Sequence, residues 1–266
     1  MKKNKLYIPV LLMAVAVSSC TNSLLNMTPD SSLTTTNFFK TSNDMDQAVI
    51  GIYSGMQDRK PKDYLLMEMP GDNLYMGTAT PGANDLDFLT VNAENIPVAD
   101  FWEKSYTGIA RANAVLENID RPADYAAGKK EQFTGEAKFM RALFYFDLVR
   151  LYGGVPLVTK TPSITEAKNM PKASAAQVYD QIIADLKEAA DLLPAPANMV
   201  RGRASKGAAT GLLGKVYVYR KDWANAKVYL DKTIRDFGYQ LEPNFATLWS
   251  LGAEDNKEII FTIKYT

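Results

Sequence analysis

A single apolar segment limits what this chain can fold into. Between residues 137 and 151 nearly every side chain is apolar, and only four charged residues interrupt the run: Lys138, Arg141, Asp147 and Arg150. A surface helix carries one apolar stripe, whereas a helix that is apolar nearly all round must be covered on several sides. The segment is too short and too charged to span a bilayer. We therefore predict a buried central helix, ended by Gly153 and Gly154 and kept from resuming by Pro156.

Further helices are expected before and after this central helix. Their starts are marked by a side chain that can cap the first turn and a partner three residues later: Thr41 with Asp44, Asp100 with Glu103, and Ser174 with Gln177. Apolar residues at helical spacing follow each of these pairs. The predicted helices cover residues 41–59, about 100–120, and 174 to Leu193.

The last part of the chain predicts paired helices and then a strand. Small residues crowd the helix expected from Ser205 to Arg220, which favours close approach of another helix. The order Leu213-Gly214, Tyr217, Ala226, Leu230 resembles a tetratricopeptide repeat, where small residues mark the crossing point and large ones fill the gap. Residues 257–266 alternate in a way typical of a strand. The expected fold is mostly α, a tetratricopeptide-like superhelix of helix pairs with long irregular loops and a little β structure at the C-terminal end.

The central segment also carries a family resemblance. The run Glu-Ala-Lys-Phe-Met-Arg-Ala-Leu-Phe-Tyr-Phe-Asp-Leu-Val-Arg-Leu-Tyr-Gly-Gly-Val-Pro-Leu, residues 136–157, is similar to the signature helix of the SusD/RagB family. Members of that family are outer-membrane lipoproteins that capture nutrients, often glycans, for a TonB-dependent transporter. The resemblance implies that residues 41–266 are the family's N-terminal α-helical domain, with a further C-terminal part expected beyond this sequence.

The first twenty residues have the form of a bacterial export signal. A basic start precedes an apolar core from Leu6 to Val17, and Val17-Ser18-Ser19-Cys20 resembles a lipobox. We expect residues 1–19 to be a signal peptide and Cys20, the one cysteine of the chain, to become the acylated first residue of a tether over 20–40. The alternative is an ordinary signal peptide with a chance cysteine. Acyl chains at Cys20 would anchor the protein to the membrane.

Composition excludes several classes of function. The chain has no histidine, which removes the Ser-His-Asp triad and most zinc sites, and its single cysteine cannot form an internal disulfide. Lysine and arginine total 30, balanced by 30 aspartate and glutamate residues, so no basic excess favours nucleic acid. We expect no metal, no cofactor and no nucleic-acid partner.

Residues 60–99 are the candidate ligand-binding loop. Prolines and glycines interrupt any helical period there, and a loop of this length is either functional or disordered. Aromatic faces can stack on the apolar faces of sugars while carboxylates and amides bind hydroxyl groups. The candidate residues are Asp72, Asn73, Tyr75, Asp85 and Phe88. The alternative is that the aromatic residues only anchor the loop to the helices.

Polar residues within the apolar helices are interpreted as structural. We expect Asn113 to bond the backbone of a neighbouring loop, because a buried amide needs partners. Arg141 and Asp147 are expected to form ion pairs with neighbouring helices.

Three functions remain open at this point. The leading hypothesis is a lipid-anchored outer-membrane protein, displayed at the cell surface, that binds a glycan or other nutrient and delivers it to a SusC-like, TonB-dependent transporter. The second is a lipid-anchored tetratricopeptide scaffold for other envelope proteins. The third is a glycan-cleaving enzyme, for which two carboxylates suffice, but no pair is singled out by the sequence. We therefore expect a binding protein and no enzyme.

Overall fold

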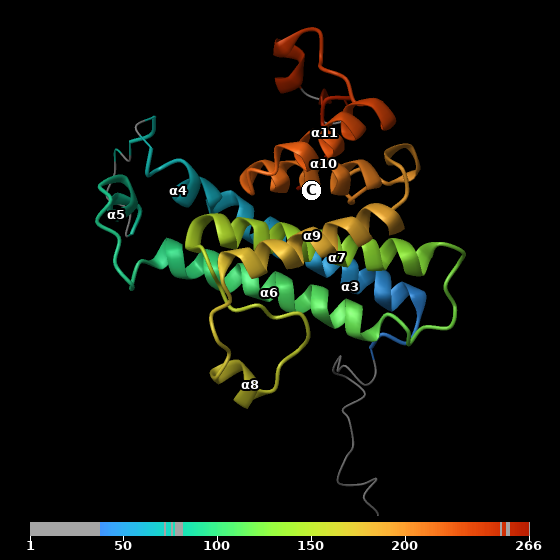
Figure 1. Ribbon diagram of the computed structural model, residues 1–266, viewed down its shortest axis with the longest axis horizontal. Helices are drawn as coiled ribbons and strands as arrows, with labels where there is room; N and C mark the ends of the chain where they lie inside the picture. The colour runs from blue at the N-terminus through green and yellow to red at the C-terminus, as the bar shows by residue number, and fades with distance from the viewer. Residues whose placement is uncertain are drawn as a thin grey trace, which may run out of the picture. The chain divides into compact units, whose positions relative to one another are not determined.

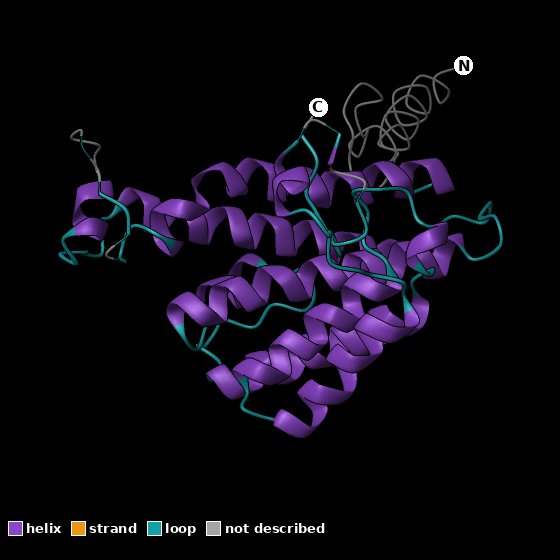
Figure 2. Ribbon diagram, turned by 90° about the horizontal axis from the view of Figure 1, so that it is seen from above, coloured by secondary structure: helices purple, strands orange, loops and turns teal. Residues whose placement is uncertain are grey.

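The computed structural model describes residues 38–71, 73–75, 77, 82–250, 252–253 and 256–265. The chain divides into two units, residues 1–39 and 40–266, and the helices described here belong to the second. They are α3 (Ser42–Arg59), α4 (Asp63–Met67), α5 (Ala83–Asp87), α6 (Ile96–Asn118), α7 (Lys129–Tyr152), α8 (Ile164–Lys168), α9 (Ala175–Leu192), α10 (Lys206–Tyr219) and α11 (Trp223–Asp236), with 3₁₀ turns η1 (Lys60–Lys62), η2 (Pro196–Asn198) and η3 (Phe245–Trp249). The all-α prediction is confirmed for the part of the chain described (Figure 2).

The helix α7 is central, as its sequence predicts. It packs against α3, α6 and α9 (Figure 1). Its large side chains Phe144, Tyr145 and Leu148 are fully buried. A Cβ added to Gly108 of α6 would lie 2.2 Å from Cζ of Phe144, so glycine is what lets α6 approach α7. The helix ends where the residue Gly153 takes φ of 69°, a left-handed value that favours glycine.

The helices α9, α10 and α11 continue the packing away from α7. The helix α10 lies between α9 and α11 and contacts both (Figure 1). A Cβ on Gly214 would come within 2.7 Å of Cδ2 of Leu230, so the small residues of α10 do admit a neighbouring helix. Helix-pair packing is thus as expected, and the likeness to a tetratricopeptide repeat is our interpretation of it.

Buried polar residues tie the helices together, and the predicted structural roles are confirmed. The guanidinium of Arg141 donates to both carboxylate oxygens of Asp185 on α9, at 2.8 and 2.7 Å. Asn113 donates to the carbonyl of Val158 at 3.0 Å, in the loop before α8. The carboxylate of Asp147 accepts from Arg59 of α3, and both side chains are almost completely buried.

The start of α6 differs from the prediction. The cap is Asn95, whose Oδ1 accepts from the backbone N–H of Val98 at 3.2 Å, and Asp100 lies within the helix. Pro97 falls in the first turn, where its missing N–H costs nothing. Asp100 instead forms an ion pair with Lys104 at 3.0 Å, one turn later.

Two further predictions need correction. Residues 60–99 contain η1, α4 and α5, so this segment is less irregular than its prolines suggest. The strand predicted over 257–266 is absent from its described residues, 257–265. Alternation alone does not make a strand, because a β-ladder needs a second strand that pairs with the first along its backbone. The described residues of this segment have one backbone hydrogen bond to another segment, from the Gln240 N–H to the Lys257 carbonyl at 3.2 Å. Phe261 packs on Phe139 of α7 instead, with ring centroids 5.0 Å apart.

Among the residues described, no helix has the length and apolar character needed to cross a bilayer. The expected signal segment and Cys20 lie outside those residues.

Candidate functional site

The candidate loop presents aromatic side chains to solvent. Tyr75 is 73% exposed and Phe88 is 62% exposed, so neither ring anchors the loop to the helices. The buried apolar side chains of this segment include those of Leu65, Leu66 and Leu86. The two aromatic rings are therefore available to a ligand, in the segment that carries α4 and α5 (Figure 1).

The polar candidates of this loop divide into three cases. Asp72 lies outside the described residues, and Asn73 is exposed. Asp85 accepts from Nδ2 of Asn95 at 3.4 Å, and the same amide donates to the Gly82 carbonyl at 2.8 Å. Asp85 thus helps hold α5 to the start of α6, which is a structural role alongside any contact with ligand.

Sequence reasoning missed Asn95, which organises this end of the loop. It caps α6 and bonds α5 at two points, the N-cap residue Gly82 and Asp85 in the middle of the helix. The available signal was its position two residues before Pro97, because proline is favoured in the first turn of a helix.

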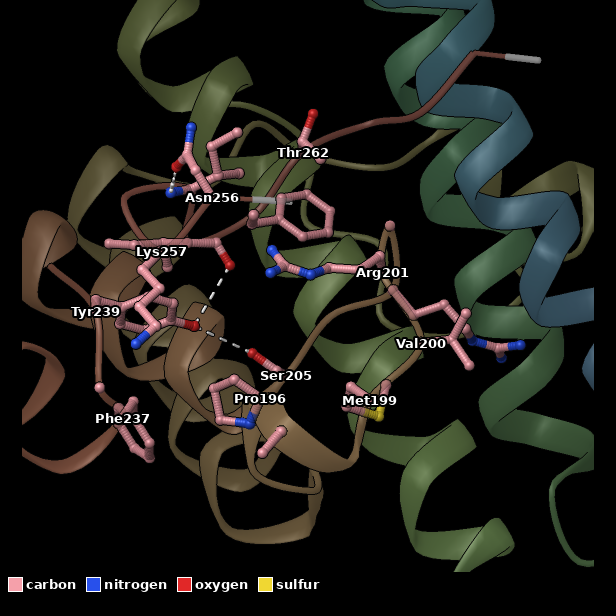
Figure 3. A pocket seen from close by; sticks show the side chains of 17 residues that line it. Pro196, Met199, Val200, Arg201, Ser205, Phe237, Tyr239, Asn256, Lys257 and Thr262 are labelled. Atoms are coloured by element: carbon pink, nitrogen blue, oxygen red, sulfur yellow. Dashed lines mark hydrogen bonds between the residues drawn. The ribbon is translucent and has the colours of Figure 1, made fainter. Parts of the chain in front are cut away.

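A hollow of about 500 Å³ lies elsewhere, between three segments far apart in sequence (Figure 3). It is lined by residues of the loop between α9 and α10, the turn after α11, and the extended chain near the C-terminal end. These residues lie within 196–205 (without 198 and 204), 237–239 and 256–262 (without 258). Sequence reasoning did not find it, because no one of these segments carries a motif. A volume of this size falls in the range of small-molecule sites. We refer to it below as the C-terminal pocket.

Tyr239 occupies one wall of the C-terminal pocket. Its hydroxyl lies 3.5 Å from Oγ of Ser205 and 3.5 Å from the Ile260 carbonyl (Figure 3). Burial raises the pKa of Tyr239, so its hydroxyl stays protonated at neutral pH. A Cβ on Gly207 would lie 2.5 Å from the tyrosine oxygen, so glycine at this position makes room for the ring.

The loop that forms another wall is held rigidly. Arg203 donates from Nε to Glu136 at 2.8 Å and from Nη1 to Asp46 at 2.7 Å. The hydroxyl of Tyr53 donates to Glu136 at 2.7 Å and accepts from the N–H of Ala204 at 2.9 Å. Burial would lower the pKa of Arg203, but hydrogen bonds and charge from Glu136 and Asp46 raise it, so this residue stays charged.

A second hollow, of about 320 Å³, lies between α6 and the chain around α8. Trp102, Tyr106 and Ile109 form its α6 wall. The Tyr106 hydroxyl donates to the Pro156 carbonyl at 2.7 Å, and the amide of Asn113 is already engaged by Val158. What this hollow offers is therefore mainly apolar surface.

These sites supply rings, hydroxyl groups, amides and cations, which can hold a polyhydroxylated ligand. Within the described part of the chain, no group of three or more His, Cys, Asp or Glu residues is placed to hold a metal ion.

Comparison with known proteins decides the family. A family model described as "Starch-binding associating with outer membrane" matches residues 23–218, which is most of the chain. The chain belongs to the SusD-like family. The predicted membership is therefore confirmed, and the signature helix α7 lies inside the matched region.

Individual SusD-like relatives match over nearly the whole chain. SusD-like protein P2 of Formosa agariphila is 31% identical over 275 residues, covering 100% of this chain and 53% of that protein. A laminarin-binding SusD-like protein of known structure superposes with a TM-score of 0.75 at 28% identity, over 84% of this chain and 51% of its own. A SusD superfamily protein from Bacteroides vulgatus has the same fold, with a TM-score of 0.77 at 23% identity over 86% of this chain and 51% of its own. The chain spans about half the length of these relatives.

Proposed function

We propose that this SusD-like protein is a non-catalytic binding protein of the outer membrane. It holds a glycan nutrient and passes it to a TonB-dependent, SusC-like transporter. The observation that carries the proposal is the family match over residues 23–218, whose description joins starch binding to the outer membrane. The similarity to a laminarin-binding protein supports a glycan as the ligand class.

The anchor in this proposal is the lipid on Cys20. Several acyl chains would hold the protein at the membrane surface, since each buried CH₂ contributes about 0.8 kcal/mol. Anchoring beside a transporter raises the local concentration of captured ligand at the channel entrance, without any new contact between ligand and barrel.

The glycan contacts in this proposal include the exposed rings of the loop, Tyr75 and Phe88. Stacked rings bury the apolar faces of pyranose units, while polar neighbours such as Asn73 bind hydroxyl groups. The mechanism is equilibrium binding followed by handover, and no bond of the glycan is broken.

The test is affinity purification of the lipidated protein from detergent-solubilised outer membranes, with mass spectrometry of what co-purifies. We expect a large TonB-dependent barrel, and we expect the purified protein to bind oligosaccharides in calorimetry without releasing reducing ends. A protein that stays soluble with Cys20 intact would refute the anchor. Release of reducing ends would refute the non-catalytic role.

The second candidate is a scaffold for envelope proteins. It is favoured by exposed apolar residues on α11, where Trp223 is 64% and Ile234 is 66% exposed. Co-purification of several envelope proteins without a barrel would favour this candidate, and in that case substitution of Trp223 by alanine should release them.

A further inference from the structure

The C-terminal pocket carries positive charge. Seventeen residues line it, and three of these are cations: Arg201, Arg203 and Lys257. None of the seventeen is aspartate or glutamate. This count covers the lining residues that the structure describes, and Glu254 and Asp255 fall outside them. A concave wall with charges of one sign concentrates ligands of the opposite sign.

The three cations differ in how they are placed. Arg203 forms ion pairs with Glu136 and Asp46, so its charge is largely balanced within the protein. Arg201 points its guanidinium toward the space between Tyr239 and Thr262 in Figure 3. Lys257 is exposed, and it lies on the opposite wall of the pocket from Arg201 (Figure 3). Arg201 and Lys257 are thus the cations that a ligand would meet.

Among the described residues that line the pocket, two buried side-chain atoms have no hydrogen-bond partner, and both are donors. Oδ1 of Asn256 accepts from the N–H groups of Glu258 and Ile259, at 2.9 and 3.2 Å, while its Nδ2 is buried and has no partner. Nη2 of Arg203 is likewise buried without a partner. Both atoms are donors, and buried donors normally find acceptors. The wall therefore favours a ligand rich in acceptor oxygens.

The remaining lining suits a sugar ring. Tyr239 and Phe261 offer aromatic faces, and the ring of Phe261 is fixed by the ring of Phe139, with centroids 5.0 Å apart. Thr262 offers a hydroxyl group, whereas the buried hydroxyl of Ser205 already caps α10. Aromatic faces next to hydroxyl groups can hold the apolar and polar sides of a pyranose together.

We propose that the C-terminal pocket binds the anionic unit of an acidic glycan, a sugar that carries a carboxylate or a sulfate ester. Arg201 and Lys257 bind the anion, and Tyr239 packs against the ring. This assignment rests on the proposed glycan-binding function and names the chemical class of its ligand.

The test is isothermal titration calorimetry of the full chain, purified in detergent, with three probes of similar size. Trigalacturonate supplies carboxylates, a carrageenan tetrasaccharide supplies sulfate, and laminaritriose is neutral. We expect at least one acidic probe to bind about tenfold or more tighter than laminaritriose at low salt, because of ion pairing with the pocket. That advantage should shrink at about 0.5 M salt, since screening weakens exposed ion pairs.

Matched variants locate the site. Lys257→Gln and Arg201→Gln should each weaken the acidic probe about three- to tenfold and leave laminaritriose unchanged. Lys215→Gln is the control, because Lys215 is an exposed lysine on α10 that does not line the pocket. Circular dichroism confirms that all three variants fold.

The outcomes separate the two proposals. Tight binding of acidic probes that both pocket variants weaken supports the inference, and the better of the two probes identifies carboxylate or sulfate. Equal loss with Lys215→Gln would place the anion site elsewhere and overturn the assignment. Binding of laminaritriose with no preference for acidic probes would overturn the ligand class but leave the proposed glycan-binding function standing. Failure of every oligosaccharide to bind would contradict both.

Discussion

The buried ion pair between α7 and α9 is predicted to be costly to break. Arg141 makes four hydrogen bonds: two to Asp185, one to Oδ1 of Asn113 at 2.8 Å and one to the Thr159 carbonyl at 3.0 Å. The side chains of Arg141 and Asp185 are 5% and 1% exposed. The substitution Arg141→Met keeps much of the volume but leaves the carboxylate and two carbonyl oxygens without these donors.

The magnitude follows from the charge left behind. Removing one partner of a buried ion pair costs about 3–5 kcal/mol, because the other charge stays in a poorly solvated place. Lys138, with its Nζ 3.8 Å from Oδ1 of Asp185, can recover part of this loss. We therefore expect Arg141→Met to lower the free energy of unfolding by about 3 kcal/mol.

The assay is urea denaturation followed by circular dichroism at 222 nm, with a matched control in the same chain. Arg220→Met removes an ion pair to Asp180 at 3.4 Å, in which the side chains are 34% and 68% exposed. Exposed pairs contribute roughly 0–1 kcal/mol, so this control should change stability little. Adding Asp185→Asn to Arg141→Met should restore part of the loss, since the buried charge is then removed. The reasoning is refuted if the free energy of unfolding of Arg141→Met lies within about 1 kcal/mol of that of the parent protein.

Three further outcomes are expected. Gly108→Ala should lower the free energy of unfolding by about 1–3 kcal/mol in thermal or urea denaturation, because the added Cβ would lie 2.2 Å from Cζ of Phe144. In the control Gly51→Ala the added Cβ would meet no atom within 4 Å, so stability should be unchanged or slightly higher. Replacing both exposed rings, Tyr75→Ala with Phe88→Ala, should weaken glycan binding about tenfold in calorimetry while leaving unfolding unchanged, and unchanged affinity would remove them from the site. Burial would raise the pKa of Asp147, but the charges of Arg59, Lys60 and Arg150 lower it overall. The stabilisation that ionised Asp147 contributes is therefore present above the unfolded pKa of about 4 and is lost as the pH falls through the lower folded pKa. The substitution Asp147→Asn should then flatten the pH dependence of the free energy of unfolding below about pH 4. An unchanged pH dependence in that variant would contradict this.

Much of the helical framework could be read from the sequence, because local chemistry decides where helices begin and end. The capping pairs Thr41 with Asp44 and Ser174 with Gln177 form as predicted. The all-round apolar character of α7 required helices on several sides, and α3, α6 and α9 supply them. Family membership also followed from α7, because its residues form one continuous and specific run.

Tertiary structure decided what depends on segments far apart in the chain. The sequence predicted Asp100 as the cap of α6, but the structure uses Asn95, whose amide bonds Gly82 and Asp85 of the α5 segment. The alternation in 257–265 was compatible with a strand, but Phe261 packs on α7. A periodic pattern shows which side chains share a face, and it does not show what that face packs against.

The candidate loop and the C-terminal pocket also differ in how far the sequence alone could predict them. Composition alone marked Tyr75 and Phe88 as candidates, and their exposure in the structure leaves both rings available to a ligand. The pocket needed Arg201, Tyr239 and Lys257, which lie on three segments and carry no shared motif. Sequence determines local conformation through short-range sterics and hydrogen bonding, whereas a pocket forms only when packing brings distant side chains to one place.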